Sequence, residues 1–276
     1  MKTVYHCFPE GKIKALTLSY DDGKESDTRL VQLLNQYNVK STFNINSGLF
    51  GNDGGLGIRL NEEEARELYE NHEVSIHTFN HPTLTRCPKE QVVLQILEDR
   101  KNLERIFKRT IRGMAYPNVD GYNEEIKKVL PLIGVDYARI TGSSMNFFMP
   151  KDYYQWQFTC DHRHDLIKLG KEFASLNKTQ YFYMMSVYGH TIDLEKENCW
   201  TLFEDFLKLV SGKNNVWYAT NIEIVDYLRA LDNLRFSVDL SFVENPFSNT
   251  CWISVDNQVF MLPGGTRTFL NIPKKG

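Results

Sequence analysis

Apolar runs typical of buried strands alternate with amphipathic stretches along most of the chain. A β-rich run at residues 15–20 precedes a helical stripe at 27–37 and a second strand at 41–45. Because strands that alternate with helices in this way form parallel sheets, the pattern predicts an α/β barrel. Further strands are predicted at 73–76, 111–116, 137–140, 181–188 and 216–219, with helices at 61–71, 88–109, 123–130, after Asp165, at 202–210 and at 222–231.

The pattern changes near Asn233 to short alternating runs separated by Asn, Pro and Gly. Such runs predict a small antiparallel β appendage. We therefore divide the chain into a barrel at 1–231 and an appendage at 232–276 that packs on it, with carbohydrate binding by the appendage as a minor alternative. The predicted strands lie at 234–240, 251–255, 259–262 and 268–272.

Side chains that bind metals or carry protons follow several of the predicted strands. All carboxyl ends of a parallel barrel lie on one face, where active sites form, so these side chains are predicted to converge. The groups at strand ends are Asp21 with Asp22, His77 with His81, Tyr116 with Pro117, and His190.

Two imidazoles and one carboxylate would make a three-ligand site for zinc or a similar divalent ion, with a position open for water. Asp21 and Asp22 are adjacent, so both cannot face the ion equally. One can bind the metal while the other accepts protons. A bound ion would lower the pKa of its water towards about 7, so a modest carboxylate base would suffice.

Four short motifs resemble those of the polysaccharide deacetylase family (NodB-like, carbohydrate esterase family 4). Residues 19–23 read S-Y-D-D-G against the family's T-F-D-D-G, and residues 77–81 match H-[ST]-x-x-H. Residues 115–117 and 187–190 resemble the third and last motifs. The resemblance spans about 15–231 and implies a distorted (β/α) barrel.

The resemblance also implies roles for individual residues. Asp21 would be the catalytic base, and Asp22 would bind the metal with His77 and His81. His190 would be the general acid. The implied activity is removal of acetyl groups from an N- or O-acetylated carbohydrate, with metal-bound water as nucleophile. Zinc is the expected ion, with cobalt, nickel or manganese as alternatives.

The third motif departs from the usual R-P-P-Y-G. Ala115 stands in the place of the Arg that orients the base, and Asn118 in the place of the Tyr whose backbone N–H would stabilise the oxyanion. Arg112 and Arg139 are the candidate replacements for the Arg. Asp193, three residues after His190, is the candidate partner of that His.

A second group of possible ligands occupies residues 160–165, at a predicted helix start. We interpret His162 and His164 as substrate contacts or capping residues rather than a second metal site. Trp156 is a candidate sugar-stacking residue, although packing is the favoured interpretation. Trp200, Tyr153 and Tyr154 are interpreted in the same way.

Composition narrows the function classes. The net charge is -3, with 32 basic and 35 acidic residues and no long basic run, so nucleic acid is not an expected partner. The five cysteines form no C-x-x-C pair and are expected to be reduced thiols. No apolar stretch is long enough for a signal peptide or a membrane span, which predicts a cytoplasmic protein, with a trimmed secreted form as the alternative.

Two other functions are compatible with these residues. The same metal site could open another C–N bond, as in cyclic amide or imide hydrolases. A carbohydrate-binding protein with an inactive barrel is the alternative from a different class. The presence of Asp21 beside Asp22 argues against it, because binding alone does not need a base.

Overall fold

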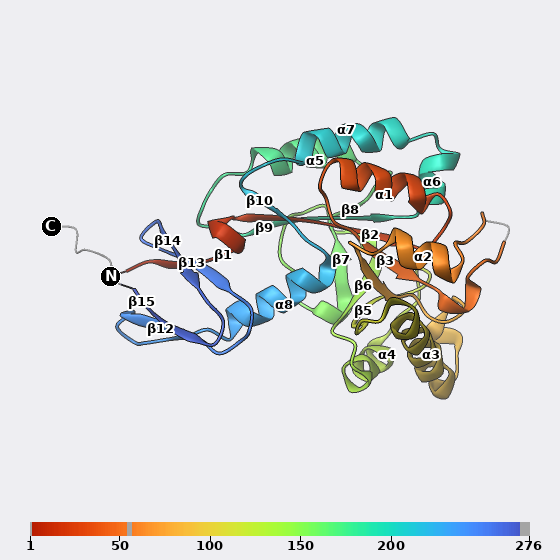
Figure 1. Cartoon of the computed structure of the whole chain (residues 1–276), viewed down its shortest axis with the longest axis horizontal. Helices are drawn as coiled ribbons and strands as arrows, with labels where there is room; N and C mark the ends of the chain where they lie inside the picture. Colours follow the sequence, from red (N-terminus) through yellow and green to blue (C-terminus); the bar gives the residue numbers. More distant parts are fainter. Residues whose placement is uncertain (1, 54–56, 271–276) are drawn as a thin grey trace.

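The computed structural model describes residues 2–53 and 57–270. These residues form a nine-stranded parallel sheet covered by helices and two three-stranded antiparallel sheets at one end (Figure 1). The predicted fold class is therefore confirmed: an α/β barrel of parallel strands with an antiparallel β appendage.

The elements follow the predicted alternation. The strands of the parallel sheet are β2 (Lys14–Asp21), β3 (Thr42–Ile45), β4 (Glu73–Ile76), β5 (Gly113–Ala115), β6 (Tyr137–Ser143), β7 (Trp156–Phe158), β8 (Cys160–Asp161), β9 (Tyr183–Gly189) and β10 (Val216–Tyr218). The helices are α1 (Asp27–Gln36), α2 (Glu62–Leu68), α3 (Lys89–Phe107), α4 (Glu124–Val129), α5 (Leu166–Ser175), α6 (Thr191–Lys196), α7 (Trp200–Val210) and α8 (Asn221–Asp232).

The sheet order brings the strand ends to one rim. The strands pair in the order β7-β6-β5-β4-β3-β2-β9-β8, and β10 pairs with the first half of β2. Every ladder in this sheet is parallel, so all carboxyl ends point the same way. All eight residues of β2 are buried, and the polar Asp21 stands at its carboxyl end. This rim carries the candidate site.

Helix ends agree with their sequence signals. Asn61 and Glu64 form a capping box at the start of α2, and Thr220 and Glu223 form another at the start of α8. Helices α1, α5, α6 and α7 lie on one side of the sheet in Figure 1, and α3 and α4 lie on the other.

The short elements β7, β8 and α6 are among those that were not predicted. Each is too short for a clear periodicity. The helix predicted after Asp165 is α5, which begins at Leu166; before it, Cys160 and Asp161 form β8 and Asp165 adopts a left-handed φ of 51°.

The amino-terminal strand pairs with strands of the appendage. The amino-terminal strand β1 (Val4–Cys7), assigned by sequence to the barrel, pairs with β13 (Cys251–Val255), which in turn pairs with β14 (Gln258–Leu262). Helix α8 lies between the barrel and these strands (Figure 1), and its Tyr227 hydroxyl donates to the Cys7 carbonyl at 2.6 Å. The second small sheet contains β11 (Arg235–Phe236), β12 (Phe242–Asn245) and β15 (Thr266–Phe269), while the last residues of the strand predicted at 268–272 lie outside the described part.

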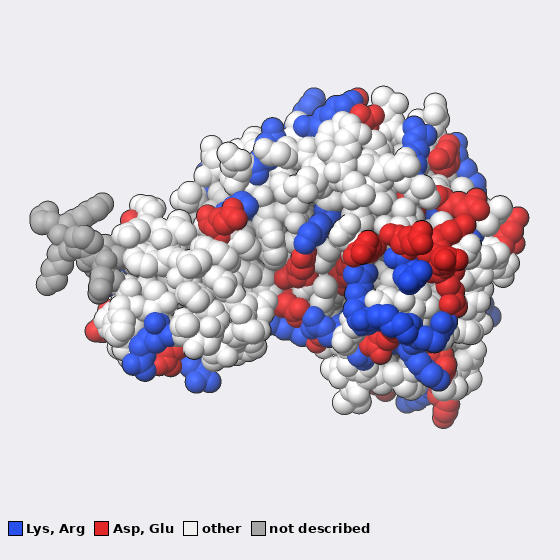
Figure 2. Space-filling view, viewed as in Figure 1, with Lys and Arg blue, Asp and Glu red and all other residues white. Residues whose placement is uncertain are grey.

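The face shown in Figure 2 carries most of its charged side chains on the right, over α2 and α3, with acidic and basic residues side by side. One such ion pair joins Arg105 of α3 to Glu62 of α2 at 2.7 Å. Exposed pairs of this kind contribute little to stability. Within residues 2–53 and 57–270, no helix has both the length and the apolarity needed to cross a membrane.

Candidate active site

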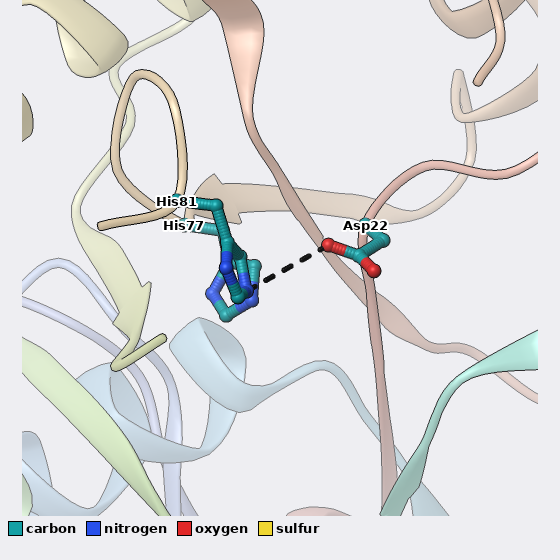
Figure 3. A group of neighbouring side chains, drawn as sticks. All are labelled: Asp22, His77 and His81. Carbon is teal, nitrogen blue, oxygen red and sulfur yellow. Dashed lines mark ion pairs between the residues drawn. The ribbon is translucent and has the colours of Figure 1, made fainter. Parts of the chain in front are cut away.

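Asp22, His77 and His81 converge at the carboxyl rim of the barrel (Figure 3). Asp22 follows β2 and His77 follows β4, and both imidazoles point towards the Asp22 carboxylate. One potential ligand atom from each residue lies within 4.8 Å of the others, and His81 Nε2 is 3.9 Å from Asp22 Oδ1. Asp22 and His81 adopt left-handed φ values of 82° and 61°. The loop backbones therefore direct the three side chains inward.

The donor set fits a divalent ion. His77 Nδ1 donates to the Ala115 carbonyl at 2.8 Å, so Nε2 is the nitrogen available to an ion. Burial, with the neighbouring His77, lowers the pKa of His81 to about 4, which leaves a neutral imidazole. Burial alone would raise the pKa of Asp22, but the surrounding imidazoles and Arg59 lower it overall. Two neutral imidazoles and a carboxylate are ligands that zinc prefers.

Asp21 is a buried carboxylate held by two donors. Asn44 Nδ2 donates to Oδ1 at 2.7 Å, and Arg139 Nη2 donates to Oδ2. Burial raises the pKa of Asp21, but the Arg139 guanidinium, together with His77 and His190, outweighs it and holds the pKa at about 2. Asp21 is therefore ionised and able to accept a proton over the whole neutral range.

Arg139 reaches Asp21 from a strand next to the one that carries the third motif. Ala115 of β5 and Arg139 of β6 are register partners, so their side chains are neighbours on one face of the sheet. Arg139 is fully buried, with its guanidinium 4.8 Å from the Tyr188 ring centre. Arg112, the other candidate, instead forms ion pairs with Asp136 and Asp226 at the start of β5.

His190 follows β9 and contacts two carboxylates. Its Nδ1 lies 3.2 Å from Asp193 Oδ2, and its Nε2 lies 3.9 Å from Asp21 Oδ2. Burial would lower the pKa of His190, but the hydrogen bond to Asp193 and the nearby carboxylates raise it overall. His190 is therefore hydrogen-bonded to Asp193, the candidate partner that lies three residues after it.

A pocket of 680 Å³ is lined by Asp21, His77, His81 and His190. Pro117 is buried and Asn118 is exposed with a φ of 63°, so the chain turns outward at the rim after β5. The Asn118 side chain donates to Thr83 Oγ1 at 3.1 Å. Other residues that line the pocket are Tyr116, Tyr122, Ile140, Arg163 and Tyr188.

Neither His162 nor Trp156 lines the pocket, and packing was the favoured interpretation for Trp156. Both side chains are 1% exposed and pack in the interior. His162 stacks on Tyr20, which neighbours Asp21 in β2 and therefore points to the opposite face of the sheet. Trp156 packs on Tyr137 and Phe158. His164, by contrast, is exposed beside Asp161 and does not line the pocket.

Other residues of the site were not found from the sequence. Asn44, the register partner of Asp21, could have been suspected as a polar residue within a buried apolar strand. Arg163 binds Asp161 through Nε and Nη2, each at 2.9 Å, and its Nη1 is 3.5 Å from Asp193. No local sequence pattern predicts the contact between Arg163 and Asp193, because it joins the end of β8 to α6.

Comparisons with known proteins agree with the motifs. Residues 9–138 match the sequence profile of the family described as "Polysaccharide deacetylase". Peptidoglycan-N-acetylglucosamine deacetylase PgdA of Listeria monocytogenes is 34% identical over 91 residues, which are 32% of this chain and 18% of PgdA. Chitin deacetylase 1 of Cryptococcus neoformans is 34% identical over 80 residues, 29% of this chain and 16% of that protein. The matched segment thus spans less than a fifth of either relative.

The fold likeness extends further along the chain than the sequence matches. A crystal structure from Mycobacterium smegmatis, assigned to the polysaccharide deacetylases, covers 82% of this chain and 93% of its own, with a TM-score of 0.56 and 16% identity. At that identity the likeness shows the shared barrel alone. The profile match contains Asp21, Asp22, His77, His81 and the third motif. Residues 9–138 therefore carry the sequence pattern of the polysaccharide deacetylase family.

Proposed function

We propose that this protein is a metal-dependent hydrolase that removes the acetyl group from an N-acetylated amino sugar. The match of residues 9–138 to the polysaccharide deacetylase family suggests carbohydrate deacetylation. The observation that supports the finer proposal is one pocket that combines a carboxylate and two imidazoles with the separate, arginine-held carboxylate of Asp21. A protein that only binds sugar would need neither the carboxylate with two imidazoles nor the Asp21 carboxylate.

Each residue then has a distinct task. A divalent ion held by Asp22, His77 and His81 would supply a Lewis acid that polarises the acetyl carbonyl and acidifies water. Asp21 accepts the proton of the attacking water, because its low pKa keeps it ionised. His190, with Nδ1 turned to Asp193, protonates the leaving nitrogen through Nε2.

The pocket wall supports a sugar substrate. Tyr116, Tyr122 and Tyr188 line it, and aromatic faces pack well against the apolar face of a pyranose ring. The backbone N–H near Asn118 is the proposed oxyanion donor. Because the names of the matched relatives refer to peptidoglycan N-acetylglucosamine and to chitin, we choose an amide-linked acetyl group over an ester.

Chelation tests the proposal directly. Acetate release from chitin oligomers is expected to vanish after treatment with EDTA and to return with Zn²⁺, Co²⁺, Ni²⁺ or Mn²⁺. A parallel panel of O-acetylated xylan oligomers and cyclic imides separates ester or ring-opening activity from N-deacetylation. Sugar binding by calorimetry without turnover of any substrate would contradict the proposal and favour an inactive barrel.

The pH dependence of the reaction tests the pairing of His190 with Asp193. Asp193→Asn removes the charge and the hydrogen bond that raise the pKa of His190, so that pKa should fall. Since the general acid must be protonated, the alkaline limb of kcat/KM against pH should move to lower pH. Glu197→Gln, which removes a nearby carboxylate that also faces Arg163, is the control. An unmoved limb in Asp193→Asn would remove His190 from the acid role.

A further inference from the structure

The segment that carries both metal-binding histidines has a strained backbone. We call residues 77–81 the ligand loop. Thr78 and His81 have φ values of 69° and 61°, a region that residues other than glycine rarely adopt and that is least favourable for a β-branched side chain. Such a backbone persists only where its surroundings hold it in place.

Helix α3 carries two buried polar residues that face this loop. Asp99 is fully buried, and its Oδ2 accepts the backbone N–H of His77 at 2.9 Å. That N–H is shared with the Ile45 carbonyl at 3.1 Å. Asp99 Oδ1 accepts the backbone N–H of Ser47, the residue that opens the loop after β3, at 2.7 Å. One carboxylate thus joins the loops that follow two neighbouring strands.

Gln95 lies one helical turn before Asp99, on the same face of α3. Its backbone carbonyl accepts the N–H of Phe79 at 2.9 Å, and its side-chain Oε1 accepts the N–H of Asn80 at 3.1 Å. Three of the five backbone N–H groups of the ligand loop are therefore bound by these two residues. We call Gln95 and Asp99 the α3 clamp.

We propose that the α3 clamp positions His77 and His81 for metal binding. This inference rests on the proposed function, because it takes residues 77–81 to carry two ligands of an ion. The clamp acts on the backbone, while the Ala115 carbonyl orients the His77 ring. Groups that orient metal ligands affect metal affinity even though they never touch the ion.

Metal affinity, rather than activity, is the decisive measurement. In Asp99→Asn a single side-chain oxygen faces two N–H groups, and the amide NH₂ opposes one of them. We expect the Kd for Zn²⁺, measured by competition with a chromophoric chelator, to rise by about 10- to 100-fold. The visible absorption of the Co²⁺ form should also change, because the two imidazoles are no longer held in one arrangement.

Glu73→Gln is the matched control. Glu73 is also a buried carboxyl, 8% exposed, and it accepts from Tyr137 Oη at 2.7 Å and Thr42 Oγ1 at 2.8 Å. Burial raises the pKa of both Glu73 and Asp99 to about 7. Glu73 stands at the opposite end of β4 from His77, so its variant should lower the Tm of the metal-free protein but leave Zn²⁺ affinity unchanged.

Gln95 supplies a second, independent pair of variants. Gln95→Leu removes the acceptor for the Asn80 N–H and should weaken Zn²⁺ binding by about 10-fold, whereas Gln95→Glu keeps an acceptor and should bind like the wild type. This pair decides the question if Asp99→Asn fails to fold. Wild-type Zn²⁺ affinity in a folded Asp99→Asn or in Gln95→Leu would overturn the clamp alone. Absence of Zn²⁺ binding by the wild-type protein would instead overturn the proposed function.

Discussion

Asp21→Asn is expected to lower kcat for deacetylation by about 10²- to 10⁴-fold, the usual contribution of a general base. Asparagine keeps the shape of the side chain and one acceptor oxygen, but its NH₂ faces one of the two donors, Asn44 or Arg139, and it cannot accept a proton. The three proposed metal ligands are untouched, so Zn²⁺ should still bind. Acetate release and Zn²⁺ affinity are therefore measured on the same preparation.

Asp22→Asn is the control for this experiment, because the neighbouring carboxylate is assigned to the metal. In contrast to Asp21→Asn, this variant is expected to lose Zn²⁺ affinity. Excess Zn²⁺ should therefore recover part of its activity. Asp21→Asn leaves the buried Arg139 without its charged partner, so both variants are compared well below the Tm of the less stable one. Substantial activity in Asp21→Asn with metal bound would contradict the role of Asp21 as the general base.

Arg139→Gln is expected to cost about 3–5 kcal/mol of unfolding free energy and most of the activity, since it leaves the buried Asp21 carboxylate without a counter-charge. The pKa of Asp21 is depressed to about 2, so the stabilisation from the pair is present above the ordinary carboxyl pKa and disappears as pH falls through about 2. At neutral pH the variant lacks all of it. Denaturant unfolding at pH 7 measures the loss.

Arg112→Gln separates this effect from the general cost of losing an arginine. Arg112 also forms ion pairs, with Asp136 and Asp226, but its side chain is 33% exposed and lies far from the rim of the site. Its variant should lose some stability and keep the kcat of the wild type. An equal loss of kcat in both variants would show that Arg139 acts only through the fold and does not tune Asp21.

The sequence alone determined the alternation of elements and the set of residues at the strand ends. These features are local: a strand followed by Asp-Asp-Gly, or two histidines four residues apart, is visible without knowing which segments touch. Parallel strands then bring their carboxyl ends to one rim, whatever their order in the sheet. For this reason Asp22, His77 and His81 could be predicted to meet.

Tertiary structure decided everything that depends on which segments are neighbours. Arg139 reaches Asp21 because β6 lies beside β5 with Arg139 opposite Ala115, a register that local periodicity does not contain. The contact of Asp99 with His77 requires α3 to pack on the end of β4, and the pairing of β1 with β13 joins strands at opposite ends of the chain. His162 shows the same principle in reverse, because it faces the side of the sheet opposite to Asp21 and lies in the core.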